Sequence, residues 1–282
     1  MKSNNPTNPT NPTNLTNLTP GNPAIHPSAI VDPTAELGEN ISIGPHCVIE
    51  RDTVIGDNCK LGPGVIIHPH VNLGDNCTVH AHAVLGDLPQ DMAFADCVSH
   101  VEIGPGNVFR EYVTVHRGTK PDTVTRIGAN GFFMAGSHVA HNCQIGDEVI
   151  FANGATLGGY VQVGDAAFLS GHVVVHQFCR VGRLTMLSGQ SAASKDIPPF
   201  CILHNSETNI VSGINIIGMR RAGIEEDERT KVRTAFRMIF LQGKNLRKAA
   251  ESAAAKYKQG PANELAQFVL ESERGVCAFR RS

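Results

Sequence analysis

Three histidines and their neighbours are the residues of this sequence most suited to chemistry. His138 and His141 lie three positions apart, and His176 follows further along the chain with Gln177 beside it. Histidine titrates close to neutral pH, so an imidazole in such a cluster can act as a general base. The same side chains could also form a polar interface between subunits, and the two roles are compatible.

A six-residue repeat determines where these side chains lie. From Ile25 to Leu85, and again from Ile127 to Leu187, every sixth residue is aliphatic or phenylalanine, and the same phase returns at residues 103, 109 and 115. Each hexapeptide predicts one short strand and one corner, so three of them form a triangular coil of 18 residues. Successive coils stack roughly 4.8 Å apart, which places residues 18 or 36 positions apart above one another.

This register brings the histidines together. Gln177 lies 36 positions after His141, and Gly159 lies midway between them. None of these residues occupies the aliphatic phase, so they are expected to face outward. We therefore expect one outward patch, roughly 10 Å high, made of His138, His141, Gly159, Tyr160, His176 and Gln177.

Glycine and cysteine each favour one phase of the repeat. Glycine often follows the aliphatic residue, as at Gly44 and Gly128, and we interpret it as the residue that adopts the backbone angles of the corner. Five cysteines lie four positions after an aliphatic residue, and we expect them to be small core residues without a catalytic or metal-binding role. These are Cys47, Cys59, Cys77, Cys143 and Cys179. Such use of cysteine indicates a reducing compartment, the cytoplasm.

The chain divides into three parts. Asn, Pro and Thr make up 17 of residues 1–23, which we interpret as a disordered tail. Residues 24–218 follow the hexapeptide pattern, and interruptions near 86–102 and 116–126 predict loops that project from the coils. Residues 219–282 change to helical spacing and predict a small helical domain.

Charge is distributed unevenly between these parts. The formal net charge of −2 argues against nucleic-acid binding. Residues 1–217 contain 10 Lys and Arg against 18 Asp and Glu, whereas residues 218–282 contain 14 against 8. The C-terminal part is a candidate docking surface for an acidic partner or an ordinary solvated surface. No apolar run of about 18 residues occurs, so no membrane span is expected.

Several runs together resemble the bacterial UDP-N-acetylglucosamine O-acyltransferases, which perform the first committed step of lipid A synthesis. The resemblance covers residues 25–282. It is carried by Gln90-Asp91, Val-Thr-Val-His-Arg-Gly at 113–118, His-Val-Ala-His-Asn-Cys at 138–143, Val-His-Gln-Phe at 175–178, Asp-Ile-Pro-Pro at 196–199 and the segment 213–221. The resemblance implies an all-β left-handed parallel β-helix with a small C-terminal α-helical domain. It also implies a cytoplasmic homotrimer whose active sites lie between neighbouring β-helices.

The resemblance further implies a reaction and the residues that perform it. A (3R)-hydroxyacyl group would pass from the phosphopantetheine of acyl carrier protein to the 3-hydroxyl of UDP-N-acetylglucosamine, with no metal ion and no other cofactor. His141 would be the general base, and the N–H of Gly159 would stabilise the oxyanion. Gly189 would leave room for a long acyl chain, and the basic C-terminal helices would suit the acidic carrier protein. Other substrate-binding positions would be Gln90, Asp91, His138, Tyr160, His176, Gln177, Asn215 and Arg221.

The sequence departs from the family pattern at several positions. Met92-Ala93-Phe94 replaces the usual Leu-Lys-Tyr, which removes a cationic phosphate contact. Tyr160 replaces a common histidine, and Asn142 follows the base where aspartate is frequent, so it cannot support an imidazolium by charge. Ile217 and Ala222 replace a glutamate and a second arginine near the nucleotide. A different nucleotide sugar and a catalytically weakened relative therefore stay open as alternatives.

Two other enzyme classes share the predicted fold. An acetyltransferase would use acetyl-coenzyme A, although the long first loop and Gly189 favour a carrier-protein donor. A metal-dependent hydratase would hold zinc on three histidines. His138 and His141 are three positions apart, and this spacing would point their side chains to opposite faces of a strand, which argues against a shared zinc ion.

Overall fold

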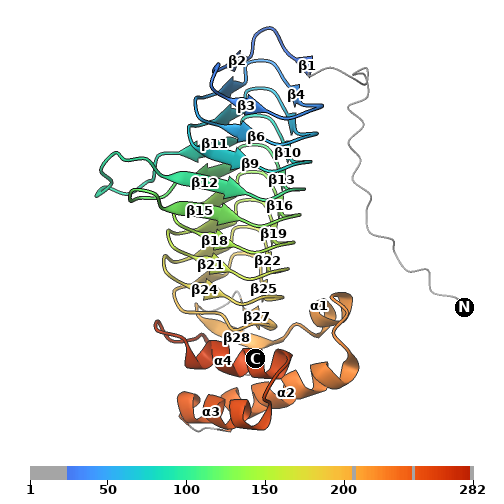
Figure 1. The fold of residues 1–282 in the computed structure, drawn as a ribbon. Coiled ribbons are helices and arrows are strands. Elements are labelled where there is room, and N and C mark those ends of the chain that lie inside the picture. The colour runs from blue at the N-terminus through green and yellow to red at the C-terminus, as the bar shows by residue number, and fades with distance from the viewer. Residues whose placement is uncertain (1–23, 205–207, 243–244, 280–282) are drawn as a thin grey trace, which may run out of the picture.

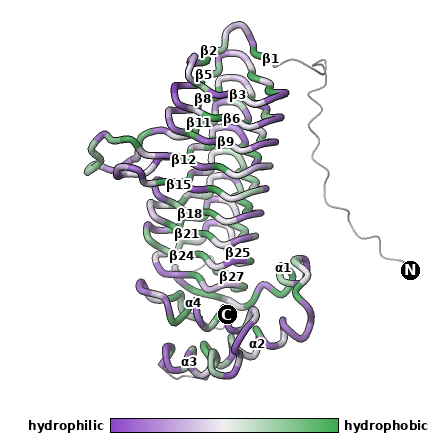
Figure 2. The backbone as a smooth tube through the Cα atoms, viewed as in Figure 1, coloured by the Kyte–Doolittle hydropathy of each residue, from purple (hydrophilic) through white to green (hydrophobic). Residues whose placement is uncertain are grey.

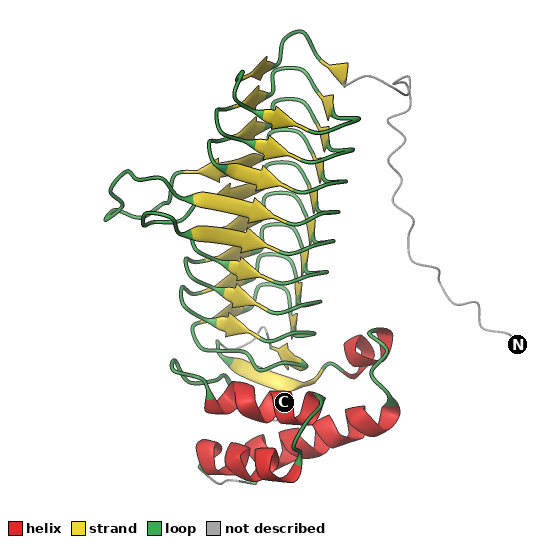
Figure 3. Cartoon of the chain, in the orientation of Figure 1, coloured by secondary structure: helices red, strands yellow, loops and turns green. Residues whose placement is uncertain are grey.

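The computed structural model describes residues 24–204, 208–242 and 245–279, so the predicted tail, 1–23, lies outside the described residues. Short strands and tight corners wind into a three-sided stack of coils (Figure 1). Helices gather at the C-terminal end of this stack (Figure 3). The strands on the three sides form three sheets that run along its length.

In spatial order, the first sheet contains β1 (Ala24–Ile25), β4 (Ser42–Ile43), β7 (Lys60–Leu61), β10 (Thr78–Val79), β13 (Val108–Phe109), β16 (Phe132–Phe133), β19 (Ile150–Phe151), β22 (Phe168–Leu169), β25 (Met186–Leu187), β27 (Cys201–Leu203), β28 (Ile210–Ile214) and β29 (Ala278–Phe279). The second sheet contains β2 (Ile30–Val31), β5 (Val48–Ile49), β8 (Ile66–Ile67), β11 (Val84–Asp87), β14 (Thr114–His116), β17 (His138–Val139), β20 (Thr156–Leu157), β23 (Val174–Val175) and β26 (Ala192–Ala193). The third sheet contains β3 (Glu36–Leu37), β6 (Val54–Ile55), β9 (Val71–Leu73), β12 (His100–Ile103), β15 (Val124–Ile127), β18 (Gln144–Ile145), β21 (Gln162–Val163) and β24 (Arg180–Val181).

Neighbouring coils pair in the register that the hexapeptides predict. Ile150 pairs with Phe168, 18 positions later. Where a loop is inserted the separation grows, and Thr114 pairs with His138. The loops 88–99 and 117–123 both leave the stack where the second sheet turns into the third, and they project to the same side (Figure 1). This edge between the second and third sheets is called the loop edge below.

The core is a continuous column of side chains inside the coils. Every aliphatic-phase residue of the two predicted runs is buried from Ile43 onward, whereas Ile25 at the open end is 40% exposed. Phe109, Phe133 and Phe151 lie over one another with ring centroids 4.8 and 5.0 Å apart. The five cysteines of the small phase are buried as predicted. Hydrophobic and hydrophilic residues alternate around each coil (Figure 2).

The corners are built differently from the sequence-based expectation. Apart from Gly86, whose φ is 90°, the glycines after the aliphatic residue do not adopt the left-handed conformation, so that prediction is wrong. The positive φ angle falls two positions later, as at Asn58 (58°) and Asn130 (58°). Gly128 instead lies against the next coil, since a Cβ there would lie 2.7 Å from the carbonyl carbon of Gly146. Glycine at this phase lets the coils stack closely, and asparagine tolerates the corner angle.

Helices α1 (Ile216–Arg221), α2 (Glu226–Phe240), α3 (Leu246–Lys256) and α4 (Pro261–Leu270) follow the β-helix. Asn245 caps α3 by accepting hydrogen bonds from the first-turn N–H groups, and Pro261 starts α4 where no intrahelical N–H is needed. Within the described ranges, none of these helices has the length and apolar character that a bilayer crossing requires.

The chain after α4 returns to the end of the β-helix. The buried carboxylate of Asp196 accepts hydrogen bonds from the backbone N–H and the Nε of Arg180 at 2.8 and 3.1 Å, and from the hydroxyl of Ser272 at 2.8 Å. The backbone N–H of Asp196 donates to the carbonyl of Gly275. The guanidinium of Arg180 also lies 4.3 Å from the ring centre of Phe268. These contacts hold the helical end against the last coils.

Candidate active site

His141 lies at the loop edge, in the corner that follows β17. It is 8% exposed. The backbone N–H of Tyr160, on the next coil, donates to the carbonyl of His141, and the two rings meet edge to face with centroids 5.3 Å apart. The N–H of Phe178 donates in the same way to Gly159 one coil further on. Thus His141, Gly159 and Gln177 stack in one column.

Gly159 lies directly against the imidazole of His141. A Cβ on this glycine would lie 2.2 Å from Cε1 and 2.5 Å from Nε2 of His141, so no larger residue leaves room for the ring. The adjacent N–H groups of Gly158 and Tyr160 donate to carbonyls on neighbouring coils. The N–H of Gly159 has no acceptor among the described residues. A free donor beside an imidazole is the arrangement that an oxyanion site needs.

Equivalent corners on another edge show what usually satisfies such an N–H group. Between the third and first sheets, the N–H of Glu39 donates to the carboxylate of Asp57 at 2.7 Å, one coil away. The N–H of Ala129 donates in the same way to Asp147 at 2.7 Å. At Gly159 the imidazole of His141 lies close by in place of a carboxylate. The donor is thereby left available.

His138 faces outward from β17 and is enclosed by polar neighbours. Its Nδ1 lies 2.7 Å from Oγ1 of Thr114, and its ring meets that of His116 with centroids 4.7 Å apart. Burial, with smaller effects from His116 and His141, lowers the pKa of His138 to about 4. The imidazole of His138 is therefore neutral at pH 7 and can act as a hydrogen-bonding group.

His116 belongs to this cluster but was not singled out from the sequence. It is 4% exposed, its Nδ1 has no hydrogen-bond partner among the described residues, and burial lowers its pKa. The loop 117–123 widens this coil, so counting in steps of 18 misses the pairing of β14 with β17. Only the V-T-V-H run itself could have drawn attention to this histidine.

The expectation that His138 and His141 point to opposite faces of a strand is wrong. His141 lies in the corner outside β17, and its charge contributes to the lowered pKa of His138. Across the described ranges, no three His, Cys, Asp or Glu side chains are grouped so that they could hold a metal ion.

His176 and Gln177 are exposed at the loop edge, two coils beyond His141. Nδ1 of His176 lies 3.4 Å from Nη2 of Arg274, which belongs to the chain after α4. Arg274 also donates to the carbonyl of Ser194 at 3.4 Å. Sequence patterns do not reveal Arg274, because only the return of the chain end brings it to this edge.

Gln90 and Asp91 are exposed in the loop 88–99, which leaves the loop edge two coils before His141. The carboxylate of Asp91 accepts a hydrogen bond from the N–H of Ala93 at 2.9 Å, which closes a turn inside the loop. Both residues therefore lie on the same edge as the histidines, although no hydrogen bond or ion pair within the described ranges joins them to a histidine.

Gly189, Asn215 and Arg221 are not brought to this column within one chain. Gly189 follows β25 at the edge between the first and second sheets, and a Cβ there would meet the carbonyl oxygen of Gly171 at an ordinary 3.6 Å. Asn215 caps α1 by accepting from the N–H of Gly218 and donates to the carbonyl of Leu184. Arg221 is exposed in the last turn of α1.

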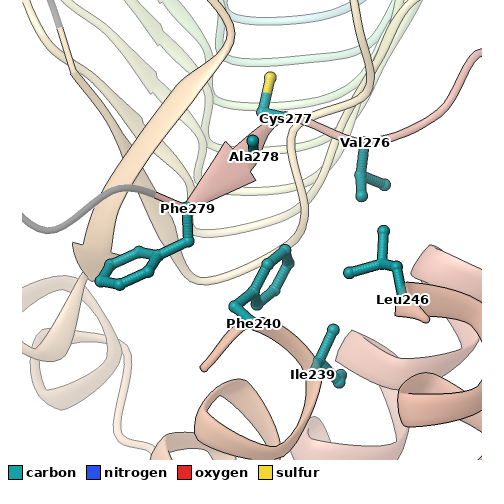
Figure 4. A pocket seen from close by; sticks show the side chains of 7 residues that line it. All are labelled: Ile239, Phe240, Leu246, Val276, Cys277, Ala278 and Phe279. Carbon is teal, nitrogen blue, oxygen red and sulfur yellow. The ribbon is translucent and has the colours of Figure 1, made fainter. Parts of the chain in front are cut away.

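Two cavities of the chain lie away from the histidines. One, of about 250 Å³, is apolar and lies between α2, α3 and β29, where Phe240, Leu246 and Phe279 line it (Figure 4). The other, of about 490 Å³, lies on the third sheet beside α4, and Arg126 and Glu264 are among its lining residues. His141 lines neither of these two cavities.

Comparison with known families assigns both parts of the fold. Residues 52–87 and 125–159 match the bacterial transferase hexapeptide family, and residues 196–277 match domain 2 of the UDP-N-acetylglucosamine O-acyltransferases. The fold and the site therefore define a hexapeptide-repeat acyltransferase with a left-handed parallel β-helix. The predicted fold class is confirmed.

Two relatives and two solved structures narrow the assignment. The acyl-[acyl-carrier-protein]–UDP-N-acetylglucosamine O-acyltransferases of Alkalilimnicola ehrlichii and Campylobacter jejuni subsp. doylei are 41% and 42% identical, over 89% and 91% of this chain and 98% and 97% of theirs. The chain belongs to this family. The UDP-N-acetylglucosamine acyltransferase structures from Bacteroides fragilis and Campylobacter jejuni match with TM-scores of 0.84 and 0.85 and identities of 38% and 36%, and cover 89% and 91% of this chain and 99% and 100% of theirs.

Proposed function

We propose that this protein transfers a (3R)-hydroxyacyl group from acyl carrier protein to the 3-hydroxyl of UDP-N-acetylglucosamine, the first step of lipid A synthesis in the cytoplasm. The observation that carries the proposal is the imidazole of His141 lying against Gly159, whose N–H has no acceptor among the residues that the structure describes. The acyl group would arrive on the phosphopantetheine of the carrier protein, so the reaction needs no resident cofactor.

The proposed chemistry uses both groups of this pair. Nε2 of His141 takes the proton of the acceptor hydroxyl as its oxygen attacks the thioester carbonyl carbon. The negative charge that develops on the carbonyl oxygen is stabilised by the N–H of Gly159. The C–S bond then breaks, and the proton on His141 passes to the leaving thiolate. An ester on the sugar and a free phosphopantetheine thiol result.

The remaining predicted residues would orient the substrates. His138 is neutral and faces outward, and Tyr160, His176 and Gln177 extend along the same edge. Gln90 and Asp91 would close over the acceptor from the loop 88–99. Asn215 and Arg221 would contact the nucleotide, and Gly189 would leave room for the acyl chain.

A homotrimer would complete this site. The outward side of the first sheet carries a column of apolar side chains, half-buried in the single chain: Val108, Phe132, Ile150, Phe168 and Met186. The outward side of the third sheet is polar, with Glu102, Arg126, Gln144, Gln162 and Arg180. An apolar column of this kind favours contact with another copy of the chain. Such contact would bring residues at other edges, including Gly189, towards a neighbour's His141.

The helical end would receive the carrier protein. Residues 218–282 contain 14 basic residues against 8 acidic ones. Arg220, Arg221, Arg233 and Arg237 are exposed on α1 and α2. An acidic carrier protein would be attracted to such a surface at low ionic strength.

Transfer from hydroxyacyl carrier protein to UDP-N-acetylglucosamine by the purified protein tests the proposal. We expect activity in the parent protein and a loss of at least about 100-fold in His141→Ala, as for removal of a general base. Parallel reactions with acetyl-coenzyme A and with other nucleotide sugars distinguish the alternatives. Activity only with one of those substrates, or equal activity in parent and variant, would overturn the proposal.

A further inference from the structure

The side chain of Asn142, next to the proposed base, is held by the loop 117–123. Its Oδ1 accepts hydrogen bonds from the backbone N–H and from the hydroxyl of Thr119, both at 3.0 Å. The hydroxyl of Thr119 also lies 2.8 Å from that of Tyr160 on the next coil. Nδ1 of His141 lies 3.0 Å from the same amide oxygen. One oxygen atom thus connects the loop, the neighbouring coil and the imidazole.

The backbone N–H of Thr119 decides which nitrogen of the imidazole carries a proton. A backbone N–H can only donate, so the Asn142 atom that faces it must be the carbonyl oxygen and not the amide nitrogen. That oxygen can only accept, so His141 must carry its proton on Nδ1. In the neutral imidazole, Nε2 then holds the free lone pair, as a general base requires.

Burial makes this hydrogen-bond chain important for local structure. His141 and Asn142 are each 8% exposed, so losing a partner there would leave a polar group unsatisfied away from water. Because Thr119 donates its hydroxyl proton to Asn142, the hydroxyl of Tyr160 must donate to Thr119. The ring of Tyr160 is itself stacked on Phe178, with centroids 4.9 Å apart.

We propose that Thr119 is a positioning residue, which sets the tautomer and orientation of His141 through Asn142 and is completed by Tyr160. This inference rests on the proposed function, since it concerns the same base. It links two departures from the family pattern, Asn142 and Tyr160, as members of one hydrogen-bond chain. Asn142 carries no charge, so loop geometry and not attraction to a carboxylate holds the imidazole.

The surroundings of the ring agree with a neutral arrangement. The titratable side chains that face His141 are His138 from β17 itself, His116 from β14 on the preceding coil and Tyr160 from the following coil. Within the described residues, no carboxylate lies at hydrogen-bond distance from the ring, and the one side-chain partner of its Nδ1 is the amide oxygen of Asn142. A carboxylate at position 142 would therefore be the first one placed beside this imidazole.

The tautomer can be measured without any substrate. Long-range ¹H–¹⁵N spectra of the full-length protein with ¹⁵N-labelled histidine report which ring nitrogen is protonated, and His141→Gln identifies the signals of His141. We expect a proton on Nδ1 in the parent and a mixture of tautomers in Asn142→Leu. A proton on Nε2 in the parent, or an unchanged tautomer in Asn142→Leu, would overturn the inference whether or not the protein proves to be an acyltransferase.

Kinetics of isosteric variants test the role of the loop. Thr119→Val is expected to lower kcat by about 10-fold or more through a misplaced imidazole, with KM for the nucleotide sugar within about 2-fold. Adding Tyr160→Phe should lower kcat little further, because both changes break the same chain of hydrogen bonds. Thr123→Val is the matched control, since that hydroxyl bonds only within the loop, to the carbonyl and N–H of Lys120. Additive losses, or an equal loss in the control, would contradict a shared chain.

A charged residue at position 142 provides a second kinetic test of the inference. In Asn142→Asp, the carboxylate would stabilise the protonated imidazole, so the acidic limb of the kcat/KM profile should move to higher pH. In the Asn142→Asp protein, Thr119→Val should lower kcat by a smaller factor than in the parent, because the charge of the carboxylate now orients the ring. If the acidic limb does not move and Thr119→Val lowers kcat as much as in the parent, position 142 does not act on His141.

Discussion

At the scale of single residues, the imidazole of His141 leaves room only for glycine at position 159. The φ angle of Gly159 is not in the left-handed region, so the glycine is required by space and not by backbone conformation. The imidazole fills the volume that any Cβ would occupy. The same closeness places the N–H of Gly159, which has no acceptor in the described part of the chain, beside the proposed base.

Gly159→Ala should therefore reduce activity without unfolding the protein. A methyl group 2.2 Å from Cε1 of His141 must displace the ring, and we expect kcat/KM to fall by about 100-fold or more. Gly213→Ala is the control, because a Cβ at Gly213 would meet no atom within 4 Å. Equal activity of both variants in the acyl-transfer assay would mean that the ring moves freely and has no fixed working position.

The lowered pKa of His138 predicts that the fold is sensitive to acid. Between its ordinary value of 6.5 and about 4, His138 is protonated in the unfolded chain but neutral in the folded one. Stability is therefore present in full above pH 6.5 and is lost as the pH falls towards about 4. The drop in Tm between pH 7.5 and 5 should be larger for the parent than for His138→Gln, by scanning fluorimetry. Identical pH dependence would speak against this assignment.

At the scale of elements, the two inserted loops are joined by one arginine. Arg117 starts the loop 117–123, and its guanidinium donates to the carbonyl of Cys97 at 2.6 Å and to the carboxylate of Asp96 at 3.0 Å. It also lies 5.7 Å from the ring centre of Phe94. The loop 88–99 is thereby held at the edge where His141 lies.

Arg117→Ala should loosen the loop 88–99 and weaken acceptor binding. We expect KM for UDP-N-acetylglucosamine to rise by about 10-fold while Tm changes little, because the lost contacts lie in a loop. Faster hydrogen exchange confined to residues 88–99 would accompany this change. Arg126→Ala, which removes an exposed ion pair with Glu102 on the third sheet, serves as the comparison. A similar KM in both variants would contradict the proposed role.

At the scale of the whole molecule, one side of the prism is apolar and another is polar. The column on the first sheet includes Phe132, Ile150 and Phe168, which pair in register on successive coils. A glutamate in the middle of this column would place a charge in the interface of the proposed trimer, and buried unpaired charge is strongly unfavourable.

Phe168→Glu should consequently dissociate the proposed trimer into monomers and abolish acyl transfer. Light scattering coupled to size-exclusion chromatography would report the mass, with the parent expected at three times the chain's 30.1 kDa. Gln162→Glu adds the same charge to the polar third sheet and should leave both mass and activity unchanged. A parent protein that is already monomeric, or an active monomeric variant, would contradict a site built between copies.

The sequence by itself determined the periodic part of this protein. A repeat of six places its aliphatic phase and its small-residue phase inside the coils, so the strands, the buried cysteines and the column from His141 to Gln177 can be predicted from residue spacing alone. Two expectations that went beyond the repeat are wrong. The corner angle was assigned to the wrong residue, and the opposite facing of His138 and His141 was wrong because His141 lies outside the strand.

Only the tertiary structure decided the contacts that join separate segments. Thr119 reaches Asn142 because a loop folds back over its own coil, and Arg274 reaches His176 because the chain end returns from the helices. Neither pairing obeys a repeat, so no spacing in the sequence signals it. The tautomer of His141 depends on such a contact, since it is set by the direction of one backbone N–H on a neighbouring loop.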